Sequence, residues 1–236
     1  MERVLPKTLN YQDVLPLAVE SRSRRRTFFP VNGATFTSGG ANVIRIDLSS
    51  DALLDTQHSY LRFTLKAKTR GCGIDFAGGH SFIRRLRIEQ SGTVLEDINS
   101  YNRLMGAIVL PCQSSDEHHK ESTITQITNN SDVQIAADDS YVFTIPLNSG
   151  LLNNDKLIPL MLMSAPLTIE IELENAVRAA AWNTDATGTY EISNVRYIAN
   201  LIEVGQDVSQ QLRMLQEVSG GVLTLAGQTY RHFTGA

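Results

Sequence analysis

Apolar and polar residues alternate along much of this chain with a period of two. The clearest segment is Val43-Ile44-Arg45-Ile46-Asp47-Leu48, and residues 60–65 repeat the pattern with Arg62 and Thr64 between apolar positions. Such alternation is typical of a β-strand with one buried face and one solvated face. Similar segments follow at 82–88, 93–95, 124–127, 141–147, 167–173 and 190–204. We therefore expect about eight strands.

Turn-forming residues separate these segments, as in Ser38-Gly39-Gly40, Gln90-Ser91-Gly92 and Asn148-Ser149-Gly150. No helical pattern alternates with the strands, which argues against parallel βαβ units. Helical spacing occurs in two sets of positions: Ile98, Tyr101, Met105 and Ile108, and then Val204, Val208, Leu212, Leu215 and Val218. The pattern predicts an all-β fold, an antiparallel eight-stranded jelly-roll sandwich with one or two short helices.

The pattern also suggests three parts along the chain. Residues 1–30 form an N-terminal arm with a basic cluster, because apolar positions are scattered there and Arg22, Arg24, Arg25 and Arg26 lie close together. Residues 31–205 form the jelly-roll domain. Residues 206–236 contain a helix, the pair Gly220-Gly221 and a terminal strand that begins at Val222, an arrangement that the start of a second jelly roll would explain.

The composition indicates a globular protein, with 42% hydrophobic and 19% charged residues. A formal net charge of −4 gives no overall attraction to a polyanion. Two cysteines, Cys72 and Cys112, match neither a disulfide framework nor a zinc site, so we expect free thiols. The first residues lack a continuous apolar segment, which predicts no secretory signal, and the most apolar run, 157–169, is interrupted by prolines and too short to span a membrane.

Familiar catalytic signatures are missing from the sequence, so we expect no enzyme and no cofactor. His118-His119 follow Asp116-Glu117, but neighbouring side chains diverge, and an exposed loop explains them better than a metal site. We expect His80 to pack in a turn. Glu170, Glu172 and Glu174 alternate with apolar residues, which predicts a solvated sheet face in preference to a pair of catalytic carboxylates.

Arginines provide the candidate contact residues, and each set has two interpretations. The cluster Arg22, Arg24, Arg25 and Arg26 either binds phosphates of a nucleic acid or forms a solvated or inter-subunit segment. Arg84, Arg85 and Arg87 lie in one predicted strand, where a protein interface is favoured over an anion site. Trp182 lies in a predicted loop, and we favour a subunit contact there over a carbohydrate platform.

Several of these segments resemble double-jelly-roll virus major capsid proteins. The resemblance begins with Phe28-Phe29-Pro30-Val31-Asn32-Gly33, Asn42 to Asp47, and Ser59-Tyr60-Leu61-Arg62-Phe63. It continues through Phe82 to Glu89, Gly92 to Glu96 and Asn99 to Leu104. The segments Leu157-Ile158-Pro159-Leu160 and Leu167 to Ile171 are similar to the later strand pair of that family. Together these segments cover roughly residues 28–205.

The resemblance implies a structural coat protein that self-assembles into capsomers of an icosahedral shell. Its partners would be copies of itself, as a trimer in preference to a pentamer, other capsid proteins, and the viral genome through the N-terminal arm. It implies location in the virion after assembly inside the host cell. A double jelly roll needs two sandwiches, so a first jelly roll, a cleaved product and a single-jelly-roll relative all stay open. The alternative from another class is a carbohydrate- or ligand-binding β-sandwich.

Overall fold

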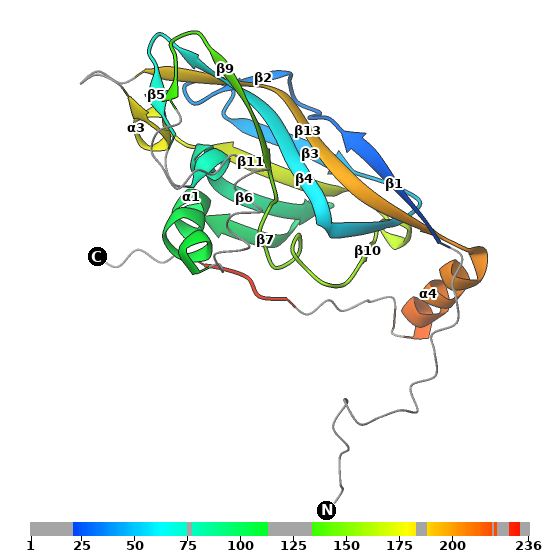
Figure 1. Ribbon diagram of the computed structural model, residues 1–236. Coiled ribbons are helices and arrows are strands. Elements are labelled where there is room, and N and C mark those ends of the chain that lie inside the picture. Colours follow the sequence, from blue (N-terminus) through cyan, green and yellow to red (C-terminus); the bar gives the residue numbers. More distant parts are fainter. Residues whose placement is uncertain are drawn as a thin grey trace, which may run out of the picture.

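A computed structural model shows two β-sheets packed face to face (Figure 1). The structure describes residues 21–74, 77–112, 134–182, 188–218, 220 and 227–231. Alternating burial runs along most strands, as in β3 (Val43–Leu48), where Ile44, Ile46 and Leu48 are buried. The period of two that is visible in the sequence is therefore the period with which side chains enter the space between the sheets.

The larger sheet has six strands. Its two longest strands, β4 (Leu53–Lys68) and β13 (Thr189–Val204), pair antiparallel in the middle. The free side of β13 pairs with β1 (Ser21–Phe28) and β2 (Thr35–Thr37), and the free side of β4 pairs with β9 (Ser140–Ile145) and β10 (Ile158–Pro159).

The second sheet has four strands in the order β3, β11, β6 and β7. Strand β11 (Leu167–Leu173) lies between β3 and β6 (Ile83–Gln90), and β7 (Thr93–Asn99) pairs with β6 at the edge. A tight turn at Ser91-Gly92, both with positive φ, joins β6 to β7. Every pairing in both sheets is antiparallel.

The order of pairing identifies a jelly roll. The pairs are nested: β6 pairs with β7, β4 with β9, β3 with β11, and β1 with β13. Counted outward from the β6–β7 hairpin, successive pairs alternate between the four-stranded and the six-stranded sheet. A long two-stranded ribbon therefore wraps around the core. The predicted fold class, an antiparallel eight-stranded jelly-roll sandwich with short helices, is confirmed.

Smaller elements cover the ends of the sandwich (Figure 1). A three-stranded sheet consists of β12 (Ala181–Trp182), β5 (Cys72–Gly73) and β8 (Gln134–Ile135). The short helical segments are η2 (Gly78–Phe82), α1 (Tyr101–Leu104), the π-helix η3 (Met105–Val109), η4 (Leu110–Cys112), η5 (Leu160–Leu162) and α3 (Ala176–Ala179). Helix α4 (Gln206–Val218) follows β13 and has no buried residue.

Aromatic rings fill one end of the core. The rings of Phe63 and Phe143 stack with centroids 5.5 Å apart, and Phe82 lies edge-on to Tyr190 at 5.1 Å. The Tyr190 hydroxyl donates a hydrogen bond to the backbone oxygen of Glu174. Large buried rings of this kind contribute much of the apolar area that stabilises a sandwich.

Three local expectations need correction. The part of the predicted arm from Ser21 to Phe28 is strand β1, because β13 supplies a hydrogen-bonding partner along its whole length. Trp182 belongs to β12 and not to a loop, since Ala181-Trp182 pairs with Cys72-Gly73. Ile98, which was expected in a helix, lies in strand β7. Ser100, whose φ is 54°, separates that strand from helix α1, which begins at Tyr101. The predicted strands at 124–127 and from Val222 lie outside the described residues.

Candidate interaction surfaces

The outer face of the four-stranded sheet carries a row of alternating charges. Strand pairing places Arg45, Glu170, Arg87 and Asp97 side by side on β3, β11, β6 and β7. Glu170 accepts from Arg45 at 2.7 Å and from Arg87 at 3.3 Å. Asp97 accepts two hydrogen bonds from Arg85, at 2.7 and 2.5 Å. These hydrogen bonds lower the pKa of the Asp97 carboxyl and raise the pKa of Arg85.

This row changes the interpretation of the glutamates. Glu170 and Glu174 are buried, 9% and 6% exposed, and do not form the solvated face predicted from their alternation. Glu170 is covered because two arginine side chains reach it from the neighbouring strands, and Glu174 accepts a hydrogen bond from Asn102 at 2.9 Å. Glu172 accepts from Arg84 at 3.1 Å.

The candidate arginines of β6 are therefore all engaged within the sheet. Arg84, Arg85 and Arg87 each bind a carboxylate of their own chain. The negative charge of each carboxylate offsets the positive charge that its arginine could offer to a further anion. Their role in a protein interface stays a prediction.

The basic cluster on β1 is divided between two faces of the strand. Consecutive side chains of a strand point to opposite sides, so Arg22, Arg24 and Arg26 share one side and Arg25 points to the other. Arg24 binds Glu203 at 2.7 Å, and the guanidinium of Arg26 lies 5.0 Å from the centre of the Phe28 ring. The four guanidinium groups thus do not form one continuous array, and their contact with a nucleic acid stays a prediction.

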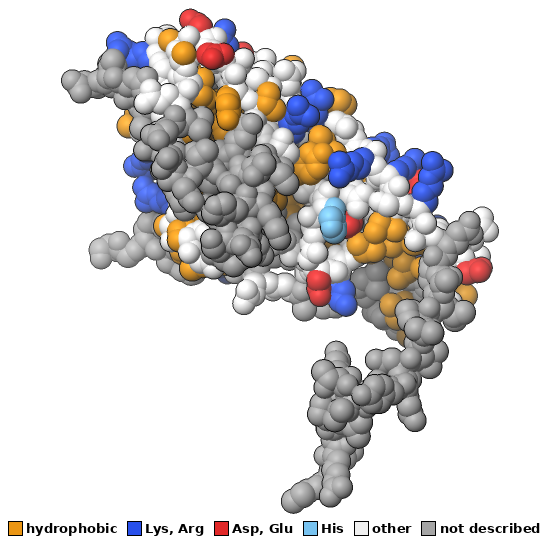
Figure 2. Space-filling view, in the orientation of Figure 1, with side chains coloured by type: hydrophobic (Ala, Val, Ile, Leu, Met, Phe, Trp, Pro, Cys, Tyr) orange, Lys and Arg blue, Asp and Glu red, His pale blue; other side chains and the backbone are white. Residues whose placement is uncertain are grey.

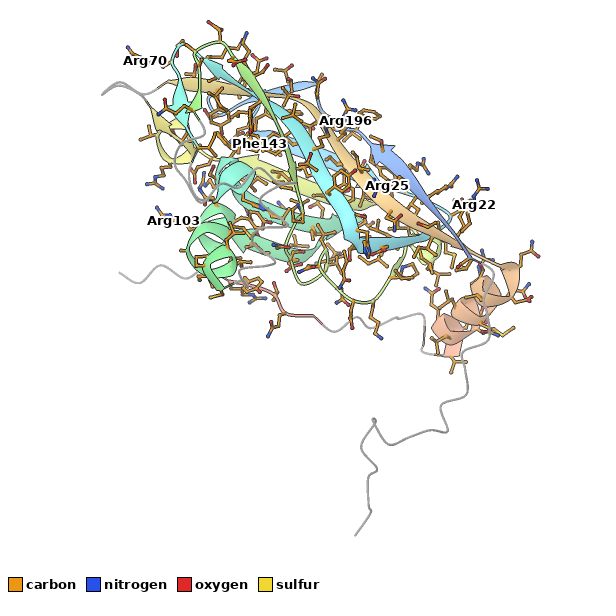
Figure 3. All side chains as sticks on the ribbon, in the orientation of Figure 1. Arg22, Arg25, Arg70, Arg103, Phe143 and Arg196 are labelled. Atoms are coloured by element: carbon orange, nitrogen blue, oxygen red, sulfur yellow. The ribbon has the colours of Figure 1, made fainter. Side chains whose placement is uncertain are left out.

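Sequence reasoning missed a second group of arginines, on the outer face of the six-stranded sheet. Arg62 of β4 lies directly opposite Arg196 of β13. Arg25 reaches over from β1, with Nη1 3.5 Å from the Tyr60 hydroxyl. Lys and Arg side chains are spread along this face in Figure 2, and Arg25 and Arg196 project from neighbouring strands in Figure 3. These residues are far apart in the sequence and come together only through the strand register, so no local sequence motif could have predicted the group.

The remaining candidates offer no assembled chemistry. His118-His119 and their acidic neighbours lie outside the described residues, and so does the environment of the Trp182 side chain. Across the described ranges, no three His, Cys, Asp or Glu side chains converge as metal ligands. Cys72 is buried and Cys112 exposed, and both are free, as predicted; burial raises the pKa of Cys72 to about 11.

His80 was expected to pack in a turn, and it lies in a short 3-10 helix that is buried in the core. It belongs to η2, is 1% exposed, and its ring centre lies 5.8 Å from that of Tyr101. Neither ring nitrogen has a hydrogen-bond partner among the residues that the structure describes. Burial lowers the pKa of His80 to about 3, so the ring is neutral near pH 7.

A carboxylate also fixes the loop that follows β9. Glu96 of β7 accepts hydrogen bonds from the backbone nitrogens of Gly150 and Leu151, at 2.8 and 3.0 Å. The extended segment 227–231 passes directly over this loop, and a shallow hollow between them is lined by Leu95, Glu96 and Thr229. Both Glu96 oxygens are used to hold backbone, so this carboxylate has a structural task.

Among the described helices, none is long and apolar enough to cross a membrane.

Comparison with known proteins gives matches to solved structures. No protein-family model and no curated protein matches the sequence. The chain is similar to PBCV-1 VP54, fitted into a reconstruction of the virophage Sputnik, with a TM-score of 0.57 and 13% identity over 85% of this chain and 46% of that one. A quasi-atomic model of the PBCV-1 virus capsid matches with the same values.

The major capsid protein of Faustovirus also matches, with a TM-score of 0.55 and 10% identity, over 87% of this chain and 57% of that one. The chain thus spans about half the length of the structures that it matches. At these identities the likeness concerns the fold. The resemblance to double-jelly-roll capsid proteins is confirmed at that level: this chain has the fold of one jelly roll of these virus capsid structures.

Proposed function

We propose that this chain is a structural capsid protein that self-assembles through its jelly-roll surfaces into capsomers of an icosahedral shell. The observation that carries the proposal is the match of 85% of the chain to capsid structures at a TM-score of 0.57. The nested strand order supports it, because a closed sandwich is a rigid block that presents sheet faces and end loops to its neighbours.

The proposed partners are further copies of the chain and other capsid proteins. A trimer is favoured over a pentamer, and the proposed location is the virion, after assembly inside the host cell. We propose no enzymatic role: the carboxylates of the four-stranded sheet described above bind arginines or hold backbone, as Glu170 and Glu96 do.

The test is the mass of the purified protein by light scattering over a concentration series, with negative-stain microscopy of the same samples. Discrete trimers, pentamers or shells are expected. A monomer at every concentration would contradict self-assembly and favour a ligand-binding sandwich, for which a screen of carbohydrates by calorimetry is the next measurement.

A further inference from the structure

The two sheets differ in how their outer faces balance charge. On the four-stranded sheet, the arginines of β6 and Arg45 of β3 bind carboxylates on adjacent strands. On the six-stranded sheet, Arg62 and Arg196 lie directly opposite each other, and neither has an ion pair in the described part of the chain. The same fold therefore contains one compensated face and one with uncompensated positive charge.

The uncompensated charge forms a defined surface, which we call the arginine face: Arg25, Tyr60, Arg62 and Arg196. The Arg25 guanidinium lies 5.8 Å from the centre of the Tyr60 ring, which orients it without neutralising it. Lys66 and Lys68 lie further along β4 and are paired with Asp138 and Glu191, so they are not part of this surface.

Like charges directly opposite each other on paired strands destabilise a sheet. That repulsion disappears when a carboxylate is brought to the pair from outside. Arginine and aromatic side chains are also the residues enriched at protein interfaces, where planar guanidinium groups bind carboxylates and rings fill apolar pockets. Arginines that have no ion pair among the described residues, with Tyr60 between β1 and Arg62, fit a protein partner with acidic groups.

We propose that the arginine face is the surface on which a second copy of this chain docks with an acidic part of its own surface. Charge supports this choice of partner. The chain as a whole carries a formal net charge of −4, so the surface outside the arginine face is more negative than that total. Two copies are therefore complementary when the arginine face of one meets a different face of the other. Such head-to-tail contacts close into rings when the rotation between successive copies closes, in agreement with the self-assembly proposed above, on which this inference rests.

The test compares two double variants of equal charge. Arg62→Glu with Arg196→Glu reverses the sign of the charge at two positions of the arginine face. Arg103→Glu with Arg178→Glu makes the same change in net charge at two exposed positions on α1 and α3, away from that face. Light scattering at 0.1 and 0.5 M NaCl gives the concentration at which oligomers form. We expect the first variant to raise that concentration at 0.1 M NaCl by about tenfold or more, and the second variant to change it little. Added salt should weaken the assembly of the wild type, because salt screens the attraction between charged surfaces.

The outcomes separate the two proposals. A wild-type protein that stays monomeric contradicts self-assembly itself. A wild type that assembles while Arg62→Glu with Arg196→Glu assembles equally well overturns only the arginine face. Arg62→Gln with Arg196→Gln removes the repulsion without adding charge, so it is expected to fold at least as stably as the wild type and still assemble more weakly; equal assembly would again overturn the face. Unchanged mass with lost binding to a fluorescent single-stranded oligonucleotide would instead assign the surface to nucleic acid.

Discussion

At the scale of single residues, burial and pairing decide what each charged group contributes. Glu170 illustrates this, because it lies between Arg45 and Arg87 and is nearly covered by them. Removing its charge leaves two guanidinium groups on either side of an uncharged amide. Partly buried ion pairs of this kind are more sensitive to change than exposed ones, which contribute about 0–1 kcal/mol.

We therefore predict that Glu170→Gln lowers the free energy of unfolding by about 1–2 kcal/mol, because each lost hydrogen bond to a charged group costs an amount of this order after solvent screening. Urea unfolding at pH 7 measures the change. Glu191→Gln is the matched control, since in the described part of the chain Glu191 is paired with one cation, Lys68, whose side chain is 39% exposed. Equal changes in the free energy of unfolding would show that the row of charges on the four-stranded sheet stabilises the protein no more than the Lys68–Glu191 pair does.

A second prediction concerns acid and His80. Its folded-state pKa is lowered to about 3, whereas an unfolded histidine titrates near pH 6.5. The unfolded chain therefore binds the proton first, and the stability that His80 contributes is complete above pH 6.5 and is lost as the pH falls toward 3. Between pH 7.5 and 5.5 the loss is about 1.4 kcal/mol.

Urea unfolding at these two pH values, in the wild type and in His80→Phe, tests this expectation. The pH dependence of the wild type should exceed that of the variant by about the stated amount. The same pH dependence in both proteins would mean that the protonated ring donates a hydrogen bond to an acceptor in the folded state.

At the scale of elements, strands with one apolar face could be predicted from the sequence, and strand β3 has the predicted bounds, Val43–Leu48. Strand β1 was missed because its exposed positions carry Arg22, Arg24 and Arg26 on the side that would otherwise be apolar. Charged residues on the inward side of an edge strand discourage pairing with other chains, so the absence of alternation has a physical reason. The arginine face was missed because Arg62 and Arg196 meet only through the register of β4 and β13.

The contact between segment 227–231 and the loop after β9 leads to a third prediction. A Cβ atom on Gly150 would lie 2.2 Å from the backbone oxygen of Gln228. Because that neighbour is backbone, it cannot move aside by rotating, and Gly150→Ala should detach the segment. Hydrogen exchange and limited proteolysis should both increase around residues 227–231.

Gly39→Ala serves as the control, since nothing lies within 4 Å of the Cβ added there. The interpretation fails when Gly150→Ala leaves the exchange of residues 227–231 as slow as in the wild type.

At the scale of the whole molecule, the nested pairs differ in how much chain they enclose. Strands β6 and β7 are joined by a tight turn, whereas β1 and β13 enclose nearly the entire sandwich. Closing a longer loop costs more entropy, so local pairs are expected to form early and the β1–β13 pair late.

We therefore predict that Leu86→Ala, in β6, slows refolding, whereas Phe28→Ala, in β1, mainly accelerates unfolding. Both side chains are buried, at 1% and 8% exposure. Stopped-flow measurements over a range of urea concentrations give the two rates. The reverse assignment of the two effects would place the outer pair in the folding nucleus.

The position of β13 also has a consequence during synthesis. Among the described strands it is the last to leave the ribosome, yet it occupies the middle of the six-stranded sheet, between β1 and β4. Until it arrives, the long strand β4 has one open edge, and such an edge can pair with other chains. A chain that ends before Thr189 should therefore aggregate, and the edge of β4 stays open during synthesis until translation has passed Val204.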